Sequence, residues 1–404
     1  MKYEKKTDTE ITADAEAASD RKGKADAETA SAAAASVTET APDTKLTEQI
    51  VEPLLAWYDR GRRILPWREE PTSYHVWLSE IMLQQTRVEA VKPYYDRFLK
   101  ELPDLKSLAQ VEEEHLLKLW EGLGYYNRAR NLKKAAQIVM DEYDGRMPEE
   151  KEALLALPGI GSYTAGAIAS IAFGKVYPAV DGNVLRILSR LRADGRDILD
   201  AKVKRAVEEE LLSVMPEDRP GDFNQALMEL GAMVCIPNGS PKCESCPWAV
   251  FCRAGQEGRT AEFPKKAEKK PRRVEKKTIL VIQDAELVAL RKRPDRGLLA
   301  GMYEFPSLEG HCNEREVASY LRELGLSPIR ITELPPAKHI FTHKEWHMIG
   351  YLVRVDELSD AAAKKRAETF VFVKPEKTRS AYPIPTAFAA YAEQVKMGRR
   401  NRNE

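Results

Sequence analysis

The hydrophobic pattern of this chain changes its period once, and that change limits the folds available to it. From about residue 46 to 234, apolar residues recur at helical spacing in one segment after another, with short connections. Beyond a basic, proline-containing stretch (PKKAEKKPRRVEKK, 264–277), runs such as KTILVIQ and HMIGYLVRV are alternating or β-branched. One helical segment, EREVASYLRELGL, interrupts these strands. The sequence therefore predicts a mainly α N-terminal region followed by an α+β domain.

Composition indicates where these regions begin and end. Residues 1–45 carry ten acidic and seven basic side chains and few large apolar ones, so they predict a disordered tail. After that tail we expect a helical domain at 46–234, a cysteine loop at 235–252, a basic linker at 253–275, an α+β domain at 276–392 and a basic tail at 393–404. The net charge of the whole chain is zero, so only local patches bear on its partners.

The sequence also limits where the protein works. No apolar run is long enough to span a membrane, and the first residues lack the apolar core of a secretory signal. Four of the five cysteines lie between 235 and 252, a distribution that does not match the disulfide framework of a secreted protein. We therefore expect a protein of the cytoplasm of a bacterium-like cell.

The segment WLSEIMLQQTRVEAV (77–91) predicts an amphipathic helix with a carboxylate in an unusual place. Glu80 shares a face with Val76, four residues before it, and with Leu83, three residues after it. One interpretation is a side chain that reaches solvent at the border of the helix. If Glu80 is buried instead, its pKa should rise and it can act as an acid.

The segment LPGIGSYTAGAIASIA (157–172) predicts a tight hairpin between two helices. Gly159 and Gly161 let backbone N–H groups face outward, and backbone donors at the start of a helix suit a phosphate group. A helix–helix turn that is closed by small residues explains the same five residues equally well.

Asp181, in YPAVDGNVLRILSRL (177–191), ends an apolar stretch and precedes a helical pattern. An Asp at such a position is most often an N-cap. The helix dipole and the N–H groups should also keep it ionised. A buried Glu80 and an ionised Asp181 would form a pair of carboxyl groups with pKa values shifted in opposite directions, as acid-assisted cleavage of a glycosidic bond requires.

Four cysteines in one compact loop predict a metal site. Cys235, Cys243, Cys246 and Cys252 follow the spacing C-x7-C-x2-C-x5-C. Structural zinc sites usually have two well-separated C-x2-C pairs, whereas four thiolates this close suit a [4Fe–4S] cluster. The sequence therefore predicts a metal site that holds either an iron–sulfur cluster or zinc, and Cys312 is expected to be a lone thiol.

The segment WEGLGYYNRARN (120–131) combines two glycines, two tyrosines and two arginines. Aromatic and arginine side chains on a glycine-containing loop suit wedging between bases and contact with phosphates. The alternative is a tyrosine that packs on the start of a helix.

Taken together, these segments resemble the MutY family of adenine DNA glycosylases, within the endonuclease III-like helix–hairpin–helix superfamily. The resemblance runs from about residue 46 to the end and includes LPWR, VWLSEIMLQQTRV, EGLGYYNRARN, LPGIGSYTAGAI, AVDGNVLRILSRL and FNQALMELGAMVC. It implies two helical subdomains beside a DNA cleft, an iron–sulfur loop and a Nudix-like C-terminal domain.

The resemblance also implies roles for individual residues. Glu80 would protonate an adenine that is flipped out of the duplex, and Asp181 would stabilise or capture the sugar cation. Tyr163 and Asn183 would assist at that centre. The other implied positions are Arg68 and Gln225 in the adenine pocket, Gln85 and Tyr125 as groups that insert into the duplex, Thr342 and His343 as readers of 8-oxoguanine, Gly159 and Gly161 on the DNA backbone, and Cys235, Cys243, Cys246 and Cys252 on the cluster.

The N-terminal region departs from related sequences at two places. Seven residues rather than the commoner six follow Cys235 before the next cysteine. Tyr163 occupies the position at which endonuclease III-like lyases hold a Schiff-base lysine. Because tyrosine cannot form that adduct, we expect a monofunctional glycosylase.

The C-terminal region lacks the metal ligands of Nudix hydrolases. Ala318, Ser319 and Tyr320 stand where the metal-binding glutamates would be expected. Without clustered carboxylates there is little to hold Mg²⁺ against a pyrophosphate, so we expect this domain to bind but not to hydrolyse. Thr342 stands where the family has a serine, and it keeps the hydroxyl group.

We therefore expect a monomeric adenine glycosylase with a [4Fe–4S] cluster that acts on A:8-oxoguanine or A:G mispairs in double-stranded DNA. It would be associated with the nucleoid and not with a membrane. One alternative is a glycosylase-lyase for oxidised pyrimidines, which Tyr163 and the Nudix-like domain disfavour. Another is a damage-sensing or redox-switched DNA-binding protein without catalysis, which Glu80 and Asp181 disfavour.

Overall fold

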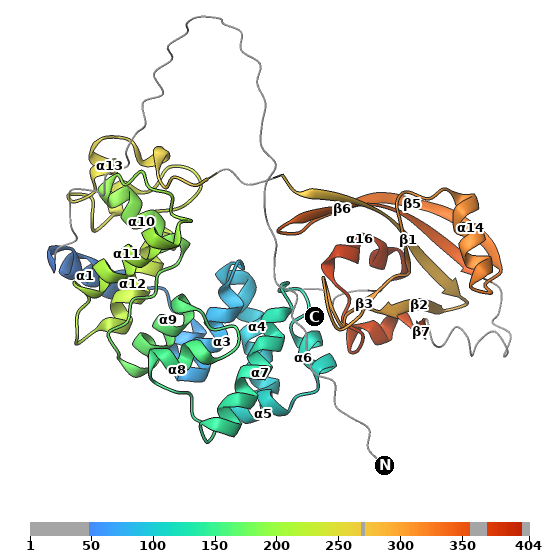
Figure 1. Ribbon diagram of the computed structural model, residues 1–404, viewed down its shortest axis with the longest axis horizontal. Coiled ribbons are helices and arrows are strands. Elements are labelled where there is room, and N and C mark those ends of the chain that lie inside the picture. Colours follow the sequence, from blue (N-terminus) through green and yellow to red (C-terminus); the bar gives the residue numbers. More distant parts are fainter. Residues whose placement is uncertain (1–47, 268–270, 356–369, 398–404) are drawn as a thin grey trace, which may run out of the picture. The chain divides into compact units, whose positions relative to one another are not determined.

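The computed structural model describes residues 48–267, 271–355 and 370–397 (Figure 1). The predicted tail at 1–45 and most of the basic tail predicted at 393–404 lie outside these ranges. Within them the chain forms a helical region and a mixed region built on one sheet. None of the helices described is both long and apolar enough to cross a membrane.

The helical region consists of short and medium-length helices joined by brief turns. In chain order they are α1 (Val51–Gly61), α2 (Pro66–Glu69), α3 (Ser73–Leu83), α4 (Val88–Glu101), α5 (Leu105–Gln110), α6 (Glu113–Leu119), α7 (Asn127–Glu142), α8 (Lys151–Ala156), α9 (Ser162–Phe173), α10 (Gly182–Arg192), α11 (Ala201–Leu212), α12 (Pro220–Met233) and α13 (Arg253–Gln256), with 3-10 segments at Glu48–Ile50, Cys243–Ser245 and Thr260–Glu262.

Two apolar cores divide this region into two subdomains, as the family resemblance implies. Helices α3 to α9 build the first core, in which Trp77 and Trp120 are fully buried. Helices α1, α10, α11 and α12 build the second core around Tyr58 and Phe223. Helix α9 packs against α3 of the first subdomain and α12 of the second, so it lies where the two subdomains meet.

The prediction of one helix over 77–91 is wrong. Helix α3 ends at Leu83, and α4 begins only at Val88. Between them Gln85 has a φ of 60°, in the left-handed region that a right-handed helix cannot continue through. The side chain of Arg128 supplies hydrogen bonds to carbonyl groups at the end of α3 that have no helical partner.

The C-terminal region is the predicted α+β domain. Its elements are β1 (Arg273–Asp284), β2 (Leu287–Lys292), β3 (Tyr303–Glu304), β4 (Ser307–Glu309), α14 (Glu314–Glu323), β5 (Pro328–Ile340), β6 (Lys344–Val355), β7 (Val371–Val373) and α16 (Ala389–Ala392), with 3-10 segments at Pro375–Arg379, Thr386–Phe388 and Glu393–Val395. The strand order is β3-β2-β1-β6-β5, with β4 also paired to β1 and β7 to β2. Strands β1 and β6 are parallel, and the other pairs are antiparallel.

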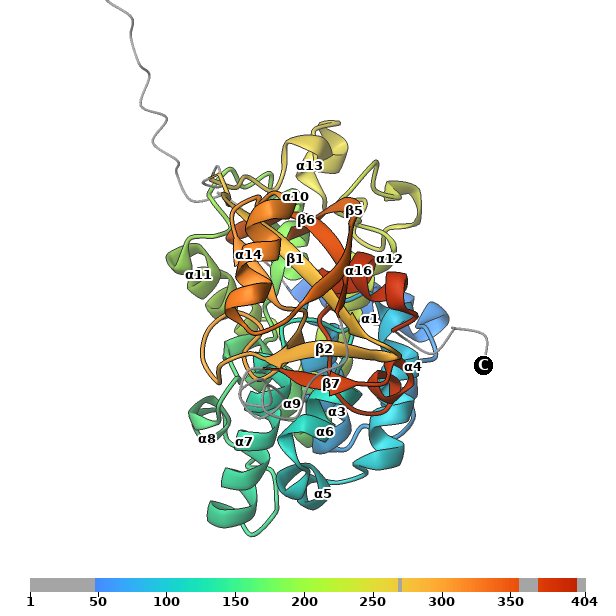
Figure 2. The same cartoon turned by 90° about the vertical axis from the view of Figure 1, so that its right-hand side faces the viewer.

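Neighbouring residues of β1 point to opposite faces of the sheet, and apolar residues on each face pack against a helical segment. On one face Leu280 belongs to a core that includes Val317 and Leu321 of α14. On the other face Ile279 belongs to a core that includes Phe388 and Tyr391 of the α16 segment. Figure 2 shows β1 running between α14 and α16.

Candidate active site

Glu80 is buried on α3, with 6% of the residue exposed. Its Oε2 accepts a hydrogen bond of 2.5 Å from the Tyr163 hydroxyl group. Burial raises the pKa of Glu80 to about 7 against the lowering effect of that hydrogen bond, and the charge of Asp181 raises it further. A carboxyl group with this pKa is partly protonated at neutral pH and can donate a proton. The interpretation of Glu80 as a solvent-facing side chain is therefore wrong.

Tyr163 lies in the first turn of the helix that follows the predicted hairpin. It is the second residue of α9, which the turn 157–161 connects to α8. Burial, together with the charges of Glu80 and Asp181, holds the pKa of Tyr163 far above its ordinary value. Tyr163 therefore keeps its proton and donates a hydrogen bond to Glu80.

The hairpin turn needs glycine for two reasons. Gly159 has a φ of 81°, and a Cβ atom there would lie 2.8 Å from the Cβ of Asn131. Gly159 and Gly161 are both exposed, so their backbone faces solvent just before the N-terminus of α9. This arrangement is compatible with the predicted contact to a DNA phosphate.

Asp181 is the N-cap of α10, as the sequence predicts. Its Oδ1 accepts hydrogen bonds from the backbone N–H groups of Asn183 (2.8 Å) and Val184 (2.9 Å). Its Oδ2 accepts a third, of 2.7 Å, from the Asn183 side-chain amide. The carboxylate therefore has a fixed orientation at the positive end of a helix.

The predicted direction of the Asp181 pKa shift is wrong. Burial raises the pKa of Asp181 above its ordinary value, although the hydrogen bonds from Val184 and Asn183 act to lower it. Removing a carboxylate from water outweighs the cap at this site. Glu80 and Asp181 therefore differ in their donors and not in the sign of their pKa shifts. Three donors within the described ranges reach Asp181 and one reaches Glu80, so the Glu80 carboxylate is less stabilised and Glu80 is the group that keeps a proton to donate.

Asn183 is fixed by the close approach of α12. Its Oδ1 accepts a hydrogen bond of 3.1 Å from Arg186. Gly231 allows the approach, because a Cβ atom at that position would lie 2.8 Å from the Cβ of Asn183. The amide that orients Asp181 is thus held from two sides.

Arg68 and Gln225 line one polar cavity of about 460 Å³ among α1, α2, α9 and α12. Near it lies Glu229, which is 1% exposed and forms ion pairs with Arg63 (Nε–Oε1, 2.6 Å) and Arg68 (Nη2–Oε2, 3.0 Å). Burial acts to raise the pKa of Glu229, but the two guanidinium groups outweigh it and hold the pKa below its ordinary value.

Sequence reasoning missed Glu229 and Arg63. The available signal was a glutamate four residues after Gln225, on the same face of an otherwise apolar helix. It is the same kind of signal that drew attention to Glu80.

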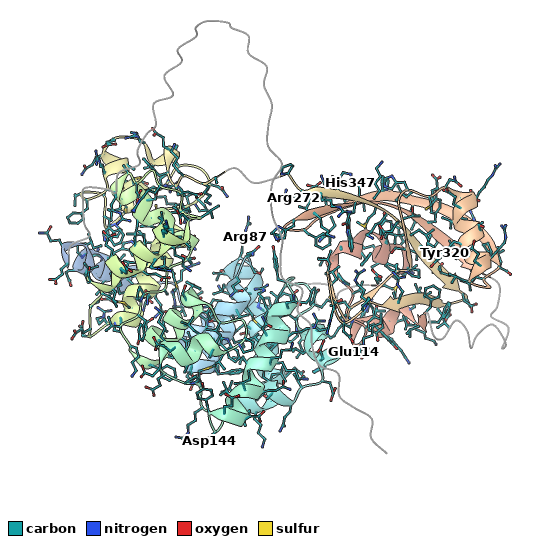
Figure 3. All side chains as sticks on the ribbon, in the orientation of Figure 1. Arg87, Glu114, Asp144, Arg272, Tyr320 and His347 are labelled. Carbon is teal, nitrogen blue, oxygen red and sulfur yellow. The ribbon has the colours of Figure 1, made fainter. Side chains whose placement is uncertain are left out.

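The two predicted DNA-inserting residues share an unusual backbone. Gln85, in the turn after α3, has a φ of 60°, and Tyr125, in the turn before α7, has a φ of 48°. Both side chains are exposed. Figure 3 labels Arg87 in the same turn as Gln85.

Thr342 and His343 lie in the tight connection between β5 and β6, and both are exposed. The residue before them, Phe341, packs edge-on against Trp346 with a centroid separation of 4.8 Å. The two candidate readers of the oxidised base therefore stand on an anchored hairpin.

The structure also places the residues that replace the Nudix glutamates. Tyr320, labelled in Figure 3, lies on α14. Glu316 of the same helix is occupied in a capping box, where its Oε2 accepts a hydrogen bond of 2.7 Å from the Asn313 N–H group. The carboxylate of Glu316 is therefore already engaged in the cap of its own helix.

The four clustered cysteines line a single cavity of about 210 Å³. Arg190 donates a hydrogen bond of 3.4 Å to the Cys235 sulfur. Burial raises the pKa of Cys246 to about 12. Within the described ranges no three His, Cys, Asp or Glu side chains converge closely enough to hold a metal ion. The four thiols are of the kind that binds metal and line one cavity, and they are spread more widely than a single bound ion requires.

Two family models match this chain. The HhH-GPD superfamily of base excision DNA repair proteins matches residues 78–215, and the Nudix domain matches residues 278–394. The HhH-GPD match covers most of the helical region, and the Nudix match covers most of the region built on the sheet.

Individual proteins are similar over longer stretches. The mouse adenine DNA glycosylase is 40% identical over 368 residues, which cover 77% of this chain and 71% of the mouse protein. The adenine DNA glycosylase of Buchnera aphidicola subsp. Acyrthosiphon pisum is 35% identical over 308 residues, or 76% of this chain and 87% of its own. A solved structure of a thermostable thymine-DNA glycosylase aligns with 52% of this chain and 97% of its own, with 30% identity and a TM-score of 0.46. With both domains matched and this identity to adenine DNA glycosylases, the chain belongs to the MutY family of adenine DNA glycosylases.

Proposed function

We propose that this DNA glycosylase removes adenine mispaired with 8-oxoguanine, or with guanine, from double-stranded DNA. The observation that carries the proposal is the buried Glu80. Its carboxyl group accepts a hydrogen bond from Tyr163, and the charge of Asp181, the N-cap of α10, raises its pKa. One group can give a proton and the other can hold a negative charge, as hydrolysis of an N-glycosidic bond requires.

The reaction would begin with the adenine extruded from the duplex, which costs a few kcal/mol of stacking and pairing. Protonated Glu80 donates its proton to a ring nitrogen of the adenine. The electrons of the N-glycosidic bond then leave with the base, and positive charge develops on the sugar.

Asp181 completes the reaction from its position at the start of α10. Its carboxylate, held by three donors, stabilises the sugar cation. A water molecule adds to the anomeric carbon, and the proton it loses returns to the Glu80 carboxylate. The products are free adenine and an abasic site, and Glu80 is again protonated.

Recognition of adenine would fall to the polar cavity of about 460 Å³, one of whose lining residues, Arg68, is near enough to Glu80 for its charge to oppose the rise of the Glu80 pKa. Arg68 and Gln225 line that cavity, and Glu229 adds an ionised acceptor held by Arg63 and Arg68. Adenine presents both donors and acceptors on its edges, so fixed polar groups of both kinds can discriminate it from other bases. Recognition of 8-oxoguanine would fall to Thr342 and His343.

The enzyme would be monofunctional. Tyr163 holds its proton and lacks an amine, so it cannot form a Schiff base with the abasic sugar. Strand cleavage would then require a separate chemical or enzymatic step.

We also propose that Cys235, Cys243, Cys246 and Cys252 hold a [4Fe–4S] cluster. The support is the donor set: four thiols on one cavity, with the Arg190 guanidinium beside the Cys235 sulfur to balance thiolate charge. The cluster would supply folding free energy to the loop, because its ligands must be brought together.

The test is release of free adenine by the full chain under single-turnover conditions. Duplexes that differ only in the base opposite adenine (8-oxoguanine, guanine or thymine) are compared, with and without alkali to reveal strand breaks. We expect release from the first two, little from A:T, and breaks only after alkali. Equal release from all three duplexes would overturn the specificity, and breaks without alkali would overturn monofunctionality.

A further inference from the structure

Two exposed side chains of the helical region stand on backbone that L residues rarely adopt. Gln85 and Tyr125 both have positive φ values, of 60° and 48°. Such conformations persist in non-glycine residues only where the surroundings impose them. They come from turns about forty residues apart in sequence, so something must hold the turns together.

The side chain of Arg128 joins the two turns. It stands in the first turn of α7 and donates to carbonyl groups of both segments. On Nη1 the acceptors are Ile81, Met82 (3.2 Å) and Gln84 (2.9 Å), and on Nη2 they are Leu123 (3.1 Å) and Gly124 (3.2 Å). Two of these acceptors, the carbonyl groups of Gln84 and Gly124, directly precede Gln85 and Tyr125 in the chain.

Two aromatic rings also lie close to the guanidinium group of Arg128. Its central carbon lies 5.4 Å from the ring centroid of Trp120 and 5.6 Å from that of Tyr125. Burial lowers the pKa of Arg128 to about 10, so the group remains charged at neutral pH. A charged donor shared among five carbonyl groups and placed near two rings is a strong and directional clamp.

We propose that Arg128 is a positioning residue that holds Gln85 and Tyr125 at a fixed spacing before DNA binds. The duplex then meets a preformed two-part wedge, and binding does not have to order the two turns. The inference rests on the proposed function, in which both side chains enter the duplex. Lysine cannot replace arginine here, because its single ammonium group lacks the planar fork that reaches both turns at once.

The first experiment follows base extrusion by the full chain. The probe is 2-aminopurine opposite 8-oxoguanine, whose fluorescence rises when it leaves the stack, at protein concentrations that saturate the DNA. We expect Arg128→Lys to slow the rise by on the order of ten- to a hundredfold. The matched control is Arg97→Lys, because Arg97 also lies over a ring (Tyr94, 4.6 Å) and donates to a carbonyl group (Leu119, 3.2 Å), but not at the wedge.

A double-mutant cycle separates positioning from general support of the fold. If Arg128 acts through the wedge, Arg128→Lys should cost less than about threefold when Gln85 and Tyr125 are already alanine. An equal loss in both backgrounds would overturn the proposal. So would a fluorescence rise in Arg128→Lys that is as fast as in the wild type.

A third measurement needs no substituted protein and no DNA. The backbone N–H groups of Thr86 and Leu123 close the two turns by bonding to Leu83 and Trp120, each at 3.1 Å. Hydrogen exchange at these amides should be slow in the free wild-type chain, and exchange as fast as in an open loop would overturn the preformed wedge. Absence of any fluorescence rise in the wild type would instead refute the proposed base extrusion, so the two failures are distinguishable.

Discussion

Replacing Glu80 by glutamine should stabilise the protein at alkaline pH while it removes the proposed proton donor. The substitution keeps the size of the side chain and leaves an oxygen that can accept the hydrogen bond from Tyr163. It removes the one feature of Glu80 that burial opposes, its negative charge.

The magnitude follows from the pKa of Glu80, which burial raises from 4.5 to about 7. The folded protein keeps a proton on Glu80 through a pH range in which the unfolded chain has lost it. The stability from this proton is fully present below about pH 4.5 and is lost as the pH rises through about 7. A rise of about 2.5 pKa units corresponds to about 3 kcal/mol. Glu80→Gln should therefore match the wild type near pH 4.5 and exceed its unfolding free energy by up to about 3 kcal/mol near pH 8.

Urea denaturation followed by far-UV circular dichroism at a series of pH values would measure this difference. The matched control is Glu89→Gln, because the side chain of Glu89 is 78% exposed and its charge is already solvated. That control should show no pH-dependent gain. A difference between Glu80→Gln and the wild type that stays constant from acid to alkali would refute the reasoning, because it would mean that Glu80 is not desolvated in solution.

Further outcomes follow from the proposed function. The single-turnover rate should fall about tenfold between roughly pH 6 and pH 8 as Glu80 loses its proton, and a rate that rises over this interval would exclude Glu80 as the acid. Asp181→Asn should abolish adenine release but keep duplex affinity, as gel-shift and release assays on one preparation would establish. Anaerobically purified protein should contain about four irons per chain, and zinc without iron would exclude the cluster. Cys246→Ser should lower both the iron content and the yield of folded protein. Alanine at both Thr342 and His343 should reduce the preference for A:8-oxoguanine over A:G by on the order of tenfold without stopping release, and equal losses on the two duplexes would contradict that role.

Much of the local structure of this site could be read from short segments of the sequence. Asp181 caps a helix as its position before Gly182 and Asn183 predicts, because capping depends on residues within one turn. The hairpin with Gly159 lies between two helices for a similar reason. Its positive φ depends on glycine at that position and not on distant residues. The strands predicted from alternating residues also lie in one sheet.

What the sequence could not predict depends on distant residues. The break between α3 and α4 has no glycine or proline to mark it, and Arg128, more than forty residues away, supplies the missing hydrogen bonds. The ionised state of Glu229 depends on Arg63 and Arg68 from another helix and its flanking turn. The sign of the Asp181 pKa shift depends on how far the folded chain removes its carboxylate from water.

Helix α9 links the hairpin that we propose to contact the DNA backbone with the residues that we propose to perform the chemistry. Its first turn carries Tyr163, whose hydroxyl contacts the acid, and the exposed Gly161 lies two residues earlier in the chain. The interior of the helix is fixed against both subdomains. A phosphate bound at the hairpin would therefore be held at a nearly constant distance from Glu80. Because placement of a substrate within about 1 Å can decide the rate, the proposed backbone contact would contribute to catalysis as well as to affinity.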